Sequence, residues 1–196
     1  VLVLFCLLPL MSTSAQATPD YKSLTVYTAL PESELPTYFS QFEKDTGIKI
    51  QYVRLSAGEL LARVRAEKNN PQATVWFGGS YDNFVPAISE GLLEAYQSPE
   101  LVNIPKVYWD VKGYANPFYV GAIGFACNTD WFKKKGLAYP TSWDDLLKPE
   151  FKGQISMAHP STSGTSYTIL ATIVQMRGEE ATWKYFSALN QNIRQY

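Results

Sequence analysis

The sequence has very little cysteine and histidine, and this scarcity excludes several kinds of site. Cys6 and Cys127 are the only cysteines, and Cys6 lies in an N-terminal run that we expect to be removed, so the remaining chain cannot form an internal disulfide. His159 is the only histidine, which excludes a site with several histidine ligands and leaves one candidate base for any Ser–His or Cys–His pair. We therefore expect no enzyme and no metal centre built from this chain alone.

Excess charge and long hydrophobic runs are also missing. Lys and Arg number 17 and Asp and Glu number 18, without a basic face, so we expect no nucleic acid partner. The apolar stretch at residues 1–10 is too short to span a bilayer, which takes roughly 20 residues, and a small-x-small motif follows at residues 15–17. This pattern is typical of a secretory signal peptide. We expect residues 1–17 to be a partial signal peptide that is cleaved after Ala17.

Strand-like and helix-like patterns alternate from residue 24 onward. Apolar or alternating runs predict strands at 24–28, 48–53 and 73–77, and helical spacing predicts a helix at 31–45. Ser56 and Glu59 have the spacing of a capping box, so a further helix is expected there. This order predicts a parallel sheet covered by helices. Ligands of such sheets bind beyond the carboxyl ends of the strands, which here carry small and hydroxyl-bearing loops at 28–30, 55–58 and 78–80.

The middle of the chain is rich in aromatic residues and glycine, and we expect it to cross between two lobes. The predicted division is a first α/β lobe at 18–115, a hinge crossover at 116–125 and the start of a second α/β lobe at 126–196.

Two predictions concern the interior of the second half. Residues 123–127 are expected to form a buried strand with Cys127 as a packed thiol, and residues 179–189 a helix that places Trp183, Phe186 and Leu189 on one side. A second lobe this small would have a thin sheet, and the chain has no starting methionine, so we expect it to be truncated at both ends.

The segment HPSTSGTS at residues 159–166 is the strongest candidate for chemistry, because it stands between a strand-like run and the start of an apolar helical run. The first N–H groups of a helix lack partners within the helix and lie at the positive end of its dipole. Hydroxyl groups add donors and glycine permits close approach, so this segment could hold an oxyanion such as phosphate, phosphonate, carboxylate or carbonate. The alternative is that Ser163 or Thr165 only caps its own helix.

Four segments in this order resemble the periplasmic solute-binding proteins of ABC importers, in the iron(III)-type branch of the extracellular solute-binding family. They are VWFGGS at 75–80, PFYVGAIGF at 117–125, TSWDDLL at 141–147 and PSTSGT at 160–165. The resemblance covers residues 24–196. It implies an α/β two-lobe fold of the type II periplasmic-binding-protein class, a hinge, an interlobe ligand cleft, a periplasmic monomer, and ABC permease subunits as partners. The residues that match the family's cleft are Thr28, Ala29, Gly79, Ser80, Ser161, Thr162, Ser163, Gly164 and Thr165.

The resemblance leaves the ligand open between iron(III) with a companion anion and a phosphorylated or phosphonate solute. Ferric members use a tyrosine pair that would lie beyond residue 196, often with a His or Glu near the end of the first strand, where this chain has Thr28, Ala29 and Leu30. No cofactor is expected, and iron would be the transported ligand. Tyr81, Tyr114 and Tyr119 either contact the ligand or pack in the core or hinge.

Two other functions remain as alternatives at this stage. One is the ligand-sensing domain of a signalling protein, which would share the fold. The other is a secreted α/β enzyme, against which stands the lack of a Gly-x-Ser-x-Gly nucleophile elbow in the sequence.

Overall fold

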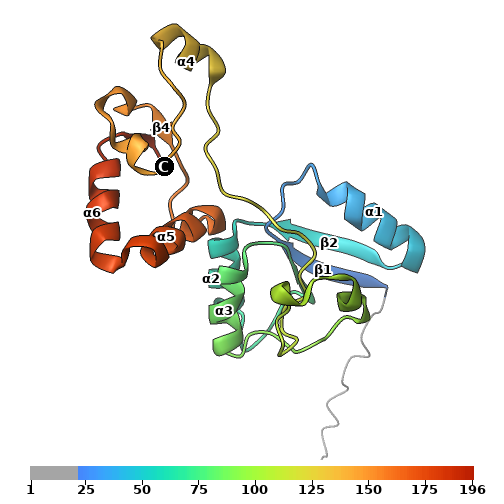
Figure 1. Ribbon diagram of the computed structural model, residues 1–196. Coiled ribbons are helices and arrows are strands. Elements are labelled where there is room, and N and C mark those ends of the chain that lie inside the picture. The colour runs from blue at the N-terminus through green and yellow to red at the C-terminus, as the bar shows by residue number, and fades with distance from the viewer. Residues whose placement is uncertain (1–21) are drawn as a thin grey trace, which may run out of the picture.

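The computed structural model describes residues 22–196, so the expected signal peptide and its cleavage site lie outside the described residues. Figure 1 shows two packed bodies, which we call the first lobe (residues 22–119) and the second lobe (residues 128–196). Residues 120–127 form the connecting segment between them. No helix among residues 22–196 has the length and apolar character needed to cross a membrane. The fold is the two-lobe α/β arrangement expected from the sequence.

The first lobe is built around a three-stranded parallel sheet in the order β2-β1-β3. In the centre, β1 places Val26 opposite Tyr52 of β2 and opposite Val75 of β3. Helices follow each strand, as the alternation of patterns predicted. The bounds are β1 (Ser23–Thr28), α1 (Leu35–Thr46), β2 (Lys49–Arg54), α2 (Ala57–Ala66), β3 (Val75–Phe77) and α3 (Tyr81–Ser89), with short 3-10 helices at Pro99–Asn103 and Lys106–Tyr108.

Local sequence signals fix the ends of these helices. Gly47 ends α1 in the left-handed region at φ 72°, which glycine adopts without steric cost. At the start of α2, the Glu59 carboxylate accepts hydrogen bonds from the backbone N (3.0 Å) and the hydroxyl (2.6 Å) of Ser56, which confirms the predicted pairing of these two residues. Pro86 lies inside α3, which continues only to Ser89.

The second lobe has a smaller parallel sheet, β4-β5, packed against two helices. Its core centres on Ile173, Tyr185 and Leu189. The helix predicted at 179–189 is α6, and Leu189 and Phe186 lie against the core as predicted. Trp183 differs from the prediction because it is 52% exposed, while Thr182 and Tyr185 are buried. The bounds are α4 (Thr129–Lys135), β4 (Ile155–Ser156), α5 (Gly164–Arg177), α6 (Glu179–Leu189) and β5 (Ile193–Gln195), with 3-10 helices at Asp144–Leu147 and Pro149–Phe151.

The prediction of a buried strand at residues 123–127 is wrong. Within the described chain this stretch has no strand or helix, Gly124 is exposed and Cys127 is half-buried. Apolar composition favours burial, but a strand also needs neighbours for its N–H and C=O groups. Neither of the two sheets in the described residues includes this stretch, so its backbone has no strand to pair with. The chain instead runs between the lobes as an extended connection (Figure 1).

Candidate functional site

The N-termini of α2, α3 and α5 meet where the two lobes touch. Because β1, β2 and β3 are parallel, their carboxyl ends lie at one edge of the sheet, and α2 and α3 begin there. The second lobe brings α5 to the same place (Figure 1). A Cβ added at Gly164 would lie 2.9 Å from Ala57 Cβ, 3.0 Å from Ser80 Oγ and 3.1 Å from Asn83 Nδ2. The partly positive ends of three helices therefore converge at this point.

On the first-lobe side, two of the predicted residues hold the loops in place. Thr28 is fully buried, and its hydroxyl accepts a hydrogen bond from the backbone N of Leu30 at 3.2 Å. The backbone N of Ala29 donates to Phe77 O at 3.3 Å and so ties the end of β1 to the end of β3. The Thr28 side chain therefore supports the loop from within the first lobe.

Gly79 and Ser80 present polar groups at the end of β3. Gly79 has φ 109°, a conformation that favours glycine, and a Cβ there would lie 3.5 Å from both Ala29 Cβ and Ala57 Cβ. The Ser80 hydroxyl accepts a hydrogen bond from Asn83 Nδ2 at 2.8 Å, which leaves its own proton available for a ligand. These residues place the turn before α3 beside the start of α2.

Tyr119 stands next to this turn. Its hydroxyl accepts from Gly79 N and donates to Gly79 O, both at 3.1 Å, while about half of the side chain (48%) stays exposed. The neighbouring Phe118 ring stacks on Phe77 with centroids 4.7 Å apart. The last residues of the first lobe are thus fastened to the candidate site. Tyr81, at the start of α3, is about half exposed (52%), and partial desolvation, together with the negative charge of Asp110, raises its pKa.

On the second-lobe side, Ser163 is confirmed as the N-cap of α5, because its Oγ accepts from Ser166 N at 3.3 Å. Its hydroxyl proton remains free to donate elsewhere. Thr165 is exposed on the first turn, and within the described chain that turn carries no acidic side chain. Capping and ligand binding are therefore compatible at this helix start.

The residues before α5 are held by short local bonds. Ser161 Oγ lies 2.7 Å from His159 Nδ1, and Thr162 Oγ1 donates to His159 O at 3.2 Å. The carbonyl of Thr162 reaches the other lobe, where it accepts from Gly58 N at 3.1 Å. Gly58 was not among the predicted site residues, because no pattern in the sequence links it to a loop of the second lobe.

Two carboxylates lie near this point, and each accepts hydrogen bonds from uncharged groups. Asp82 of α3 is engaged across the lobes, because its Oδ2 accepts from Thr168 Oγ1 at 2.7 Å. The Glu59 carboxylate is held by Ser56, whose hydroxyl and backbone N lower the pKa of Glu59. Among residues 22–196, no group of three or more His, Cys, Asp or Glu side chains could hold a metal ion. The N-termini of α3 and α5 therefore offer a ligand hydroxyl and backbone N–H hydrogen-bond donors.

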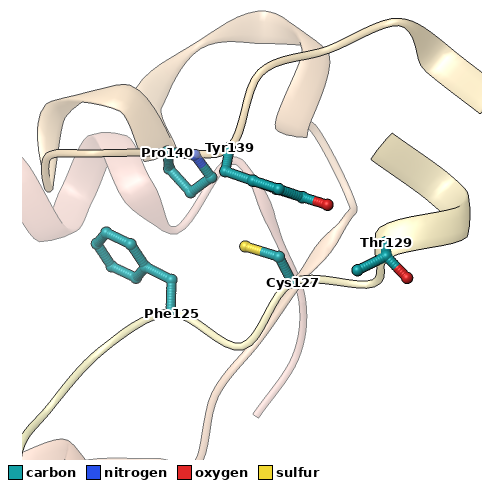
Figure 2. Close-up of a pocket in the computed structure, with 5 residues that line it drawn as sticks. All are labelled: Phe125, Cys127, Thr129, Tyr139 and Pro140. Carbon is teal, nitrogen blue, oxygen red and sulfur yellow. The ribbon is translucent and has the colours of Figure 1, made fainter. Parts of the chain in front are cut away.

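Two open hollows lie elsewhere and contain none of the predicted cleft residues. Figure 2 shows the first, about 430 Å³ in volume, at the end of the connecting segment; it is lined by Phe125, Cys127, Thr129, Tyr139 and Pro140. The second, about 290 Å³, lies near Tyr27 and Glu67, whose hydroxyl and carboxylate are hydrogen-bonded to each other at 2.9 Å.

Comparison with known families decides the identity of the chain. Residues 80–196 match the family described as bacterial extracellular solute-binding protein. The chain belongs to this family. Among similar proteins, an uncharacterized protein of Haemophilus influenzae is 37% identical over 178 residues, covering 88% of this chain and 51% of that protein. A putative 2-aminoethylphosphonate-binding periplasmic protein of Salmonella typhi is 28% identical, covering 79% of this chain and 43% of that protein.

Solved structures of solute-binding proteins share the fold. The periplasmic binding protein AfuA from Actinobacillus pleuropneumoniae, with exogenous fructose-6-phosphate bound, matches with a TM-score of 0.85 and 40% identity, over 89% of this chain and 57% of AfuA. Iron-bound HitA from Pseudomonas aeruginosa matches with a TM-score of 0.70 at 22% identity, over 89% of this chain and 56% of HitA, and supports the fold alone. The chain spans about half the length of the curated relatives that it matches.

Proposed function

We propose that this chain is part of the periplasmic substrate-binding component of an ABC importer, and that it binds a phosphorylated small organic solute between its lobes. The observation that carries the proposal is the meeting of the α3 and α5 N-termini, where Ser80, Ser163 and Thr165 supply hydroxyl groups. Helix N-termini bind phosphate groups through backbone N–H donors and the helix dipole. Aromatic side chains such as Tyr119 stand beside them and could contact an organic moiety.

Relatives support an organic phosphate over iron(III) as the ligand. AfuA, with fructose-6-phosphate bound, is 40% identical, whereas the iron-bound HitA is 22% identical. The donors gathered at the site also favour an anion, because Fe³⁺ requires hard anionic oxygen ligands and the hydroxyl and N–H groups here are neutral. Iron(III) with a companion anion stays the second candidate, favoured by a 25% identical Fe(3+)-binding periplasmic protein of Serratia marcescens.

The family is described as extracellular solute-binding protein, which supports a binding role. We infer that the partners are the solute and the permease subunits of the importer, that the protein acts in the periplasm as a monomer, and that no cofactor takes part. The named periplasmic relatives support this location and these partners. Stimulation of the ATPase activity of the reconstituted permease by the loaded protein would test the importer role.

Native mass spectrometry of the full-length mature protein, purified without added ligand, tests the proposed ligand directly. We expect a mass increment that matches a phosphorylated organic molecule, no visible colour, and binding of added fructose 6-phosphate in isothermal titration calorimetry. An iron-sized increment with a tyrosinate charge-transfer band would contradict the proposal and identify a ferric binding protein.

A further inference from the structure

The two lobes touch through backbone atoms at the first turn of α2. Gly58 N donates a hydrogen bond to Thr162 O at 3.1 Å. A Cβ added at Gly58 would lie 2.6 Å from Ser161 O and 2.8 Å from Thr162 O. Both oxygens belong to the main chain of the second lobe, so neither can rotate away as the end of a flexible side chain would. A side chain at position 58 is therefore incompatible with the observed approach of the lobes.

The backbone conformation at this position does not require glycine. Gly58 does not have a positive φ, and it is the second residue of α2, where alanine is a better helix former than glycine. The three atoms nearest to a Cβ at this position all belong to Ser161 or Thr162 of the other lobe. The absence of a side chain is thus explained by the contact between the lobes.

The same contact continues along the neighbouring helices. Gly164 of α5 is buried and fits closely against Ala57 and Ser80, and Thr168 Oγ1 donates to Asp82 Oδ2 at 2.7 Å. At the start of α2, the backbone N–H of Gly58 is already hydrogen-bonded to the carbonyl of Thr162. Both α2, through its backbone, and α3, through Asp82, therefore contact the second lobe, while the hydroxyl groups of Ser80, Ser163 and Thr165 keep a proton for a ligand.

We propose that Gly58 is the residue that permits lobe closure, so that solute affinity depends on a backbone contact outside the ligand-binding residues; the effect on affinity rests on the proposed function. Ligand affinity is reduced when the binding-competent state is less populated. Alanine at position 58 shifts the lobes toward an open arrangement, because its Cβ overlaps main-chain oxygens only when the lobes meet.

The first test compares Gly58→Ala with a Gly124→Ala control in the full-length protein. Gly124 lies in the connecting segment, and no described atom would lie within 4 Å of a Cβ there. We expect the ligand-free Gly58→Ala protein to melt at or above the wild-type temperature, yet to bind fructose 6-phosphate at least about tenfold more weakly. The control should bind like the wild type. Wild-type affinity in Gly58→Ala would overturn the proposal.

A second test does not depend on the identity of the solute. Spin labels at Lys44→Cys in α1 and Met176→Cys in α5, in a Cys127→Ser background, report the distance between the lobes by double electron–electron resonance. We expect Gly58→Ala to move the distribution toward longer distances, and Gly124→Ala to leave it unchanged. Identical distributions for wild type and Gly58→Ala, with and without fructose 6-phosphate, would overturn the proposal. Failure of the wild type to bind the probe would instead contradict the proposed ligand.

Discussion

At the residue scale, the start of α5 separates two hydroxyl groups that look equivalent in the sequence. The Ser163 hydroxyl accepts a hydrogen bond from the backbone N of Ser166 and so stabilises the helix itself. Thr165 lies on the exposed first turn and makes no hydrogen bond with its hydroxyl to another described residue. Their substitutions should therefore differ in kind, although both side chains stand where we place the anion.

We predict that Thr165→Ala weakens binding of fructose 6-phosphate by about 1.5–3 kcal/mol, the cost of losing a hydrogen bond to a charged group. The melting temperature should stay unchanged, because the hydroxyl supports no other group of the fold. Calorimetric titration of the full-length variant measures the first effect and a thermal scan the second. Unchanged affinity would remove Thr165 from the proposed site.

Ser163→Ala should in addition lower the free energy of unfolding, by about 1 kcal/mol, because the N-cap of α5 is lost. Chemical denaturation of the variant checks this expectation. A Ser163→Asn variant is the matched control, since asparagine is also a good N-cap and should restore the stability while altering the ligand contact.

At the element scale, α2 depends on the pairing of Ser56 with Glu59. Hydrogen bonds from the Ser56 hydroxyl and then from its backbone N hold the pKa of Glu59 below its ordinary value of 4.5. A lowered pKa in the folded state means that this contribution to stability is complete above pH 4.5 and is lost as the pH falls through the lowered value. Glu59→Gln should thus destabilise the protein near neutral pH and have little effect at strongly acidic pH.

Thermal melts of wild type and Glu59→Gln across the acidic range would show this convergence. Glu32→Gln, at an exposed position before α1, serves as control and should leave the melting temperature unchanged at each pH. A constant difference between wild type and Glu59→Gln at all pH values would show that the charge of Glu59 is unimportant.

Elements with local signals could be predicted from the sequence, and elements that depend on distant partners could not. Gly47 and the Ser56–Glu59 pair mark helix ends through neighbouring residues alone, and α1 and α2 lie where they were expected. The run at 123–127 looked like a buried strand by its apolar residues, but pairing depends on strands supplied from elsewhere. Trp183 was likewise expected on the inward side from its spacing with Phe186 and Leu189, whereas the packing of α6 against the second-lobe core buries Tyr185 and leaves Trp183 exposed.

The candidate site follows the same division. Parallel strands bring their carboxyl ends together, so the loops at 28–30 and 78–80 could be placed at one edge from the alternation of patterns. The hydroxyl-rich segment before α5 was recognisable because helix starts have a known chemistry. Gly58 was not recognisable, because its contact with Thr162 depends on how two separate lobes dock.

At the scale of the whole molecule, the connecting segment is the most open part of the chain between the lobes. Gly121 and Gly124 are exposed, with no described atom within 4 Å of a Cβ at either position, and Val120 is 68% exposed. We predict that brief chymotrypsin treatment of this chain cuts first near Phe125, because unpaired exposed backbone is the preferred site of proteolysis. Mass spectrometry of the fragments would locate the cut. A first cut within α2 or α5 would contradict this.

The hydrogen bond from Gly58 N to Thr162 O also makes the interface measurable in time. An amide hydrogen that is bonded across the two lobes exchanges with solvent deuterium only when that bond opens. The exchange rate of this single amide therefore reports how often the lobes part, and a bound solute that holds them together should slow it in proportion to its occupancy. Hydrogen exchange at one backbone N–H thus measures how often the two lobes separate.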